Sequence, residues 1–103
     1  MKHQVSYSDR VPEGQAVAVE AGGRKVLLVR SDDGLFALEN SCPHQCKTME
    51  QGDVLVRSIR CPYHGVEIDL VDGSIVSNAG FIGLSGVQVF EVKETDGVIY
   101  LEI

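Results

Sequence analysis

Two short runs of the chain constrain its fold more than any other feature. They read Cys-Pro-His at 42–44 and Cys-Pro-Tyr-His at 61–64, so each run places one cysteine close to one histidine. Thiolate sulfur and imidazole nitrogen are preferred protein ligands of transition metals such as zinc and iron. If both runs serve one site, the fold must bring two distant loops together. The pattern predicts a metal centre with four ligands: Cys42, His44, Cys61 and His64.

The ligand set permits two kinds of metal site. Two cysteines and two histidines are a common structural zinc composition, but zinc sites usually group Cys with Cys and His with His. Here each run mixes the two residue types, which favours an iron–sulfur centre. A zinc-stabilised interaction domain is the alternative from a different class of protein. Colour separates the two, because only the iron–sulfur protein is red-brown.

The two runs, with Gly65 directly after the second, resemble the ligand motif of the Rieske [2Fe-2S] proteins, in which two histidines replace two cysteines on one iron. The resemblance implies one [2Fe-2S] cluster, with Cys42 and Cys61 on one iron and His44 and His64 on the other. Gly65 is expected to let the backbone turn sharply beside the cluster.

Departures from the high-potential members of this family predict a low reduction potential. Those members carry an extra cysteine in each ligand loop, joined in a disulfide, and hydroxyl groups two and four residues past the last histidine. Here Tyr63 stands at the second cysteine position, so Cys46 has no partner, and the hydroxyl positions hold Val66 and Ile68. Hydrogen bonds to cluster sulfurs raise the potential. The resemblance therefore implies a midpoint near the low end of the Rieske range, roughly −150 mV.

Composition excludes several classes of function. The chain of 103 residues is long enough for one domain with a modest core, and its 44% of hydrophobic residues is ordinary for a globular protein. A formal charge of −6 argues against nucleic-acid binding. No apolar stretch is long enough to span a membrane. The N-terminal segment 1–10 has no export signal, and with the odd cysteine count this predicts a cytoplasmic protein.

Short β-branched runs separated by turn residues predict an antiparallel all-β sandwich or barrel. A first hairpin turn is expected at 21–24, around Gly22 and Gly23, and the Asp-Gly pairs at 72–73 and 96–97 indicate further turns. We expect strands at 16–20, 25–30, 35–39, 54–56, 58–60, 66–70, 74–77, 88–93 and 98–102. His3 is expected to be an exposed side chain near a flexible start.

The Rieske resemblance implies the same fold class in more detail. It predicts a single domain over 1–103, in which a β-sandwich base carries a small cluster-binding subdomain, about 41–78, built by the ligand loops. In the family a third loop covers the cluster, and segment 77–86 has the corresponding position here. Its apolar residues Phe81, Ile82 and Leu84 either cover the cluster or fill the core of the base, and the sequence leaves both open.

The resemblance also implies an electron carrier rather than an enzyme. Small single-domain members commonly serve multicomponent aromatic-ring dioxygenases, in which they pass single electrons from a flavin-dependent ferredoxin reductase to a terminal oxygenase. An acidic surface would help such a carrier to find basic partners. Two alternatives within the family are the small accessory subunit of a nitrite reductase, whose members often lack the cluster ligands, and a sensor module.

Overall fold

The computed structural model describes residues 1–43, 47–63 and 65–103. Within these residues the chain forms β-strands and one short 3₁₀ helix, Ser8–Arg10. The described residues form no helix that is long and apolar enough to cross a membrane. All strand pairs are antiparallel, which confirms the all-β prediction. The strands are β1 (Lys2–Tyr7), β2 (Ala16–Ala21), β3 (Arg24–Ser31), β4 (Gly34–Glu39), β5 (Asp53–Val54), β6 (Ser58–Arg60), β7 (Glu67–Asp69), β8 (Ile75–Ser77), β9 (Val89–Thr95) and β10 (Val98–Glu102).

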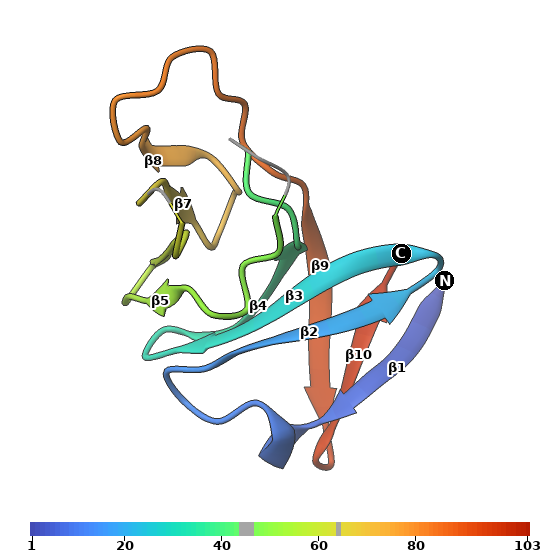
Figure 1. The fold of residues 1–103 in the computed structure, drawn as a ribbon. Helices are drawn as coiled ribbons and strands as arrows, with labels where there is room; N and C mark the ends of the chain where they lie inside the picture. The colour runs from blue at the N-terminus through green and yellow to red at the C-terminus, as the bar shows by residue number, and fades with distance from the viewer. Residues whose placement is uncertain (44–46, 64) are drawn as a thin grey trace.

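The strands form two sheets. Six of them make the larger sheet, in the order β1-β10-β9-β4-β3-β2, and the other four make a small sheet, β5-β6-β7-β8. Figure 1 shows the small sheet beside one end of the larger one, with the β8–β9 connection arching beyond it. The two chain ends lie together, since the Met1 ammonium donates to the Ile103 carbonyl at 2.8 Å and the Ile103 N–H donates to the Met1 carbonyl at 3.0 Å.

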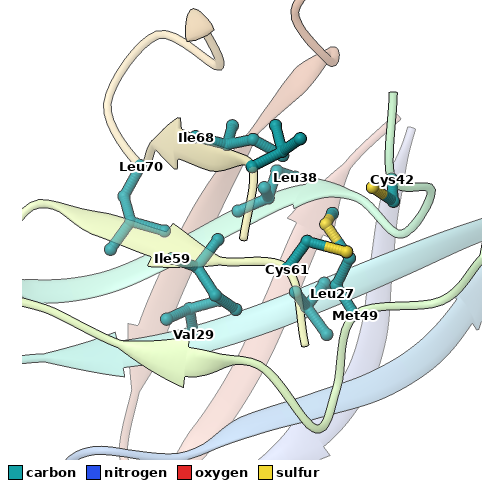
Figure 2. Close-up of a cluster of buried hydrophobic side chains, with 10 residues drawn as sticks. Leu27, Val29, Leu38, Cys42, Met49, Ile59, Cys61, Ile68 and Leu70 are labelled. Carbon is teal, nitrogen blue, oxygen red and sulfur yellow. The ribbon is translucent and has the colours of Figure 1, made fainter. Parts of the chain in front are cut away.

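Strand β3 lies between two hydrophobic cores. Its residues 26–29 are all fully buried, because Val26 and Leu28 point into one core and Leu27 and Val29 into the other. A strand covered on both faces has no need of the usual polar alternation. We call the first group, which includes Ile99 and Leu101, the base core. The second group, which we call the inter-sheet core, contains Leu27, Val29, Leu38, Cys42, Met49, Ile59, Cys61, Val66, Ile68 and Leu70 (Figure 2).

The predicted hairpin turns are confirmed. Gly22 and Gly23 both have positive φ, 57° and 76°, and so do Asp96 and Gly97, 52° and 78°. Two successive residues in this region make the type I′ turn, whose twist matches that of the flanking strands. Residue types that tolerate positive φ therefore determine where β2 turns into β3 and β9 into β10.

The N-terminus differs from the prediction. The first residues form strand β1, which pairs with β10 and sets His3 opposite Leu101, and His3 is half-buried. The expectation of an exposed histidine near a flexible start was wrong. The segment is rich in polar residues and carries little strand signal of its own, so pairing with the edge of β10 determines its conformation.

A half-buried guanidinium, that of Arg30, joins β3 to β9. The Arg30 Nη1 and Nη2 atoms donate to the two carboxylate oxygens of Glu94 at 2.9 and 2.6 Å, and Nε donates to the Val11 carbonyl at 2.9 Å. This bidentate contact holds the pKa of Glu94 at about 2, below its ordinary 4.5. Because the folded-state pKa is depressed, the pair stabilises the fold above pH 4.5, and that contribution is lost as the pH falls toward 2.

We expect Glu94→Gln to remove this pH dependence. The wild-type protein should lose about 1 kcal/mol more unfolding free energy than the variant between pH 7 and pH 2.5, after allowance for solvent screening of a partly exposed pair. Urea unfolding at both pH values measures the difference. Glu91→Gln is the matched control, because Glu91 contacts Lys93 at 3.9 Å with both side chains well exposed. Equal pH dependence in wild type and Glu94→Gln would contradict the prediction.

Candidate metal centre

The two predicted cysteine ligands lie in the same core although they come from different parts of the chain. Cys42 follows β4 and Cys61 follows β6, and their side chains are only 1% and 2% exposed. Both belong to the inter-sheet core, where they lie toward one end near Met49 (Figure 2). The other two predicted ligands, His44 and His64, lie outside the described residues. The fold therefore brings together the half of the predicted site that the structure describes.

The two cysteines begin loops that are closed in the same way. The Cys42 N–H donates to the Lys47 carbonyl at 2.8 Å, and the Cys61 N–H donates to the Val66 carbonyl at 2.7 Å. Each bond joins a cysteine to the fifth residue after it. We call the segments 42–47 and 61–66 the first and second ligand loops. In sequence, each loop starts with a buried cysteine and contains one of the predicted histidine ligands.

Gly65 shapes the second ligand loop as the sequence predicts. Its φ is +77°, a conformation that residues with a side chain rarely adopt, and its N–H donates to the Cys61 carbonyl at 3.1 Å. Among the described residues, apart from its chain neighbours, no atom lies within 4 Å of the position that a Cβ would take. The requirement for glycine here therefore comes from the backbone conformation rather than from crowding.

Asn40 anchors the first ligand loop, and the sequence interpretation missed it. Its side chain is buried, accepts the Met49 N–H at 2.7 Å and donates to the Glu50 carboxylate at 3.1 Å. The hydrogen bond from Asn40 lowers the pKa of Glu50. These contacts tie the end of β4 to the chain that leaves the loop. An asparagine directly after a strand was the available signal, because its short amide readily bonds to nearby backbone.

Apolar side chains surround the cysteines. Val66 and Ile68 are fully buried in the inter-sheet core, and Phe81 and Leu84 from the β8–β9 connection pack against the same core. Ile82 is 92% exposed. The segment that was expected either to cover the cluster or to fill the base core thus contributes two of its three apolar residues to the core that holds the cysteines.

Two glycines fix the position of the β8–β9 connection. The Val87 N–H donates to the Gly73 carbonyl at 2.9 Å. At this crossing a Cβ on Gly86 would overlap with the Gly73 carbonyl oxygen, and a Cβ on Gly73 would overlap with the Val87 carbonyl oxygen. The close backbone approach explains why both positions lack a side chain.

The described half of the site suits a soft transition metal. Two thiols from separate, hydrogen-bonded loops converge in an apolar surrounding, and thiolate sulfur is the ligand type that iron–sulfur clusters and zinc use. No group of three or more Cys, His, Asp or Glu gathers as metal ligands among residues 1–43, 47–63 and 65–103, and two of the four predicted ligands lie outside these ranges. The donor atoms present fit the cysteine half of a [2Fe-2S] site.

Fold and site together define a small antiparallel β-protein with a metal centre built on two loops. The chain belongs to the Rieske [2Fe-2S] domain family, whose model matches residues 1–91. Its cofactor is accordingly one Rieske-type [2Fe-2S] cluster.

Comparison with known proteins places the chain among proteins of different lengths. It is 33% identical to human apoptosis-inducing factor 3 over 97 residues, which cover 94% of this chain and 16% of that protein. It is 32% identical over 65 residues to the ferredoxin component of the naphthalene 1,2-dioxygenase/salicylate 5-hydroxylase systems of Ralstonia sp, with 63% and 62% of the two chains covered. The chain thus spans about a sixth of the first relative and less than two thirds of the second.

A solved structure supports the fold. A chain from the complex of reduced oxygenase and oxidized ferredoxin in carbazole 1,9a-dioxygenase superposes with a TM-score of 0.84 at 24% identity. The match covers 97% of this chain and 91% of that chain. At this level of identity the similarity establishes the arrangement of strands.

Proposed function

We propose that this chain is an electron carrier and not an enzyme: a low-potential Rieske ferredoxin that passes single electrons from a flavin-dependent reductase to a terminal oxygenase of the aromatic-ring dioxygenase type. The observation that carries the proposal is the burial of Cys42 and Cys61 in one core. Each of them begins a ligand loop, and the two loops are closed by equivalent backbone hydrogen bonds. The similarity to a named ferredoxin component supports the partner class.

In this proposal Cys42 and Cys61 hold one iron of the cluster, and His44 and His64 hold the other. The cluster-binding subdomain is about 41–78, a range that contains both ligand loops and the small sheet β5-β6-β7-β8. The larger sheet is the base. Its residues Leu27, Val29 and Leu38 pack against the small sheet and hold the ligand loops in a fixed place.

A bound [2Fe-2S] cluster supplies one-electron chemistry, and the chain sets the conditions under which it works. Water has limited access to the inter-sheet core, because this core is packed by the apolar side chains of Val66, Ile68, Phe81 and Leu84. Their side chains have no hydrogen-bond donors to offer to the cluster sulfurs. Because such donors raise the potential, an apolar surrounding favours a midpoint near the low end of the Rieske range.

The partner and location belong to the same proposal. A solved complex pairs an oxygenase with a ferredoxin in a carbazole dioxygenase, and this chain is similar to a chain of that complex in fold. The formal charge of −6 favours partners with basic docking surfaces. We propose a cytoplasmic location, since an odd number of cysteines suits a reducing compartment.

We expect the purified holoprotein to accept one electron and to pass it on. An anaerobic redox titration should give a negative midpoint, roughly −150 mV at neutral pH. With a flavin-dependent ferredoxin reductase and the naphthalene dioxygenase oxygenase, the protein should support substrate turnover that stops when it is left out. A clearly positive midpoint would contradict the low-potential assignment. Reduction without turnover in any reductase–oxygenase pair would favour a sensor instead.

A further inference from the structure

The two ligand loops contact each other through exposed side chains. The Lys47 ammonium of the first loop lies over the Tyr63 ring of the second, with Nζ 4.6 Å from the ring centroid. This is the distance and placement of a cation–π interaction. Tyr63 is 46% exposed and Lys47 is exposed, so neither side chain contributes to a core. Their proximity is therefore not a by-product of core packing.

Lys47 takes part in both contacts, the closure of the first ligand loop and the contact with the second. Its carbonyl accepts the Cys42 N–H at 2.8 Å, which closes the first ligand loop, while its side chain reaches across to the second. Tyr63 lies two residues after Cys61 and directly before the proposed ligand His64. A force that holds Tyr63 in place therefore acts on the segment between two proposed ligands.

We propose that Lys47 and Tyr63 form a clamp that holds the two ligand loops together and slows the loss of the cluster. Lys47 is a positioning residue here, since it acts through Tyr63 and the loop closure rather than by binding the cluster. The clamp would slow cluster loss at the point where a bond between the cluster and a protein ligand breaks. Without the clamp, the two loops could separate before that bond re-forms. The inference rests on the cluster site proposed above.

The test follows the visible absorbance of the holoprotein after addition of an iron chelator. Lys47→Met keeps the apolar stem and removes the charge, and Tyr63→Leu keeps apolar volume and removes the ring. Each should speed cluster loss about two- to five-fold, the range that an exposed cation–π contact can supply. Because both changes remove one interaction, the double variant should lose the cluster no faster than the faster single variant.

Two kinds of control make the result specific. Lys47→Arg and Tyr63→Phe keep a cation and a ring, so both should hold the cluster at the wild-type rate. Lys2→Met is the matched distant control, because Lys2 Nζ lies 4.5 Å from the Tyr100 ring centroid on β1 and β10, in the base. This variant should leave the rate of cluster loss unchanged.

The possible results distinguish failure of the clamp proposal from failure of the proposed cluster site. Wild-type rates in both single variants, or additive effects in the double variant, would overturn the clamp while the cluster site stands. A wild-type protein that takes up no cluster would overturn the site itself. If Lys47→Met fails to take up a cluster at all, Lys47→Arg and Tyr63→Phe decide the question, because the clamp requires both to retain it.

Discussion

Purified Cys61→Ser protein is expected to be colourless. Serine has no thiolate, and soft sulfur ligands are what hold an iron–sulfur cluster. Cys61 is 2% exposed and begins the second ligand loop, so no solvent-borne ligand can easily take its place. The expected loss of cluster affinity is larger than the roughly 10- to 100-fold loss that follows when residues hydrogen-bonded to the ligands are changed. Visible absorbance per protein and iron content measure it.

Variants of the proposed histidine ligands sharpen the same result. His44→Ala and His64→Ala should abolish the Rieske spectrum, and His64→Cys should change it, because the asymmetry of Cys and His ligands produces that spectrum. Cys46→Ser is the matched control in the first ligand loop, and it should leave the cluster and the potential nearly intact. An unchanged spectrum in any ligand variant would contradict the ligand assignment. A large loss in Cys46→Ser would give Cys46 a role in the site.

Features that depend on only a few adjacent residues could be predicted from the sequence. The Gly-Gly and Asp-Gly pairs specify positive φ, so the β2–β3 and β9–β10 turns were found correctly. Gly65 was recognised for the same reason. Cys42 and Cys61 stood out because metal-ligand residue types are rare at such short spacing. The structure places both in one core, and their role as ligands stays a prediction.

Features that depend on distant partners could not be predicted. The residues of β1 have little strand propensity, and they form a strand because they pair with β10. The role of Asn40 depends on Met49, and the contact of Lys47 with Tyr63 depends on how two separate loops approach each other. The apolar residues of the β8–β9 connection were equally ambiguous, because nothing in the sequence tells which of two cores Phe81 and Leu84 join.

The second large effect is expected at the crossing between the β7–β8 turn and the β8–β9 connection. In Gly86→Ala the new methyl group would overlap with the Gly73 carbonyl oxygen and crowd Ser74. Both obstacles are backbone, which cannot rotate away as a flexible side chain would. The connection must therefore move, and Phe81 and Leu84 lose part of their packing on the inter-sheet core. We expect a loss of about 1–3 kcal/mol in unfolding free energy, as overpacking commonly costs.

Chemical denaturation of Gly86→Ala measures this loss, and the chelator assay adds a local readout. Cluster loss should be faster in this variant, because the displaced connection admits water to the core that holds Cys42 and Cys61. Ser85→Ala is the neighbouring control. It removes an exposed hydroxyl without adding an atom near Gly73, so its stability should stay within about 0.5 kcal/mol of wild type. Equal stabilities of Gly86→Ala and Ser85→Ala would show that the connection can shift at no cost. In that case its packing would not be what keeps water from the cluster.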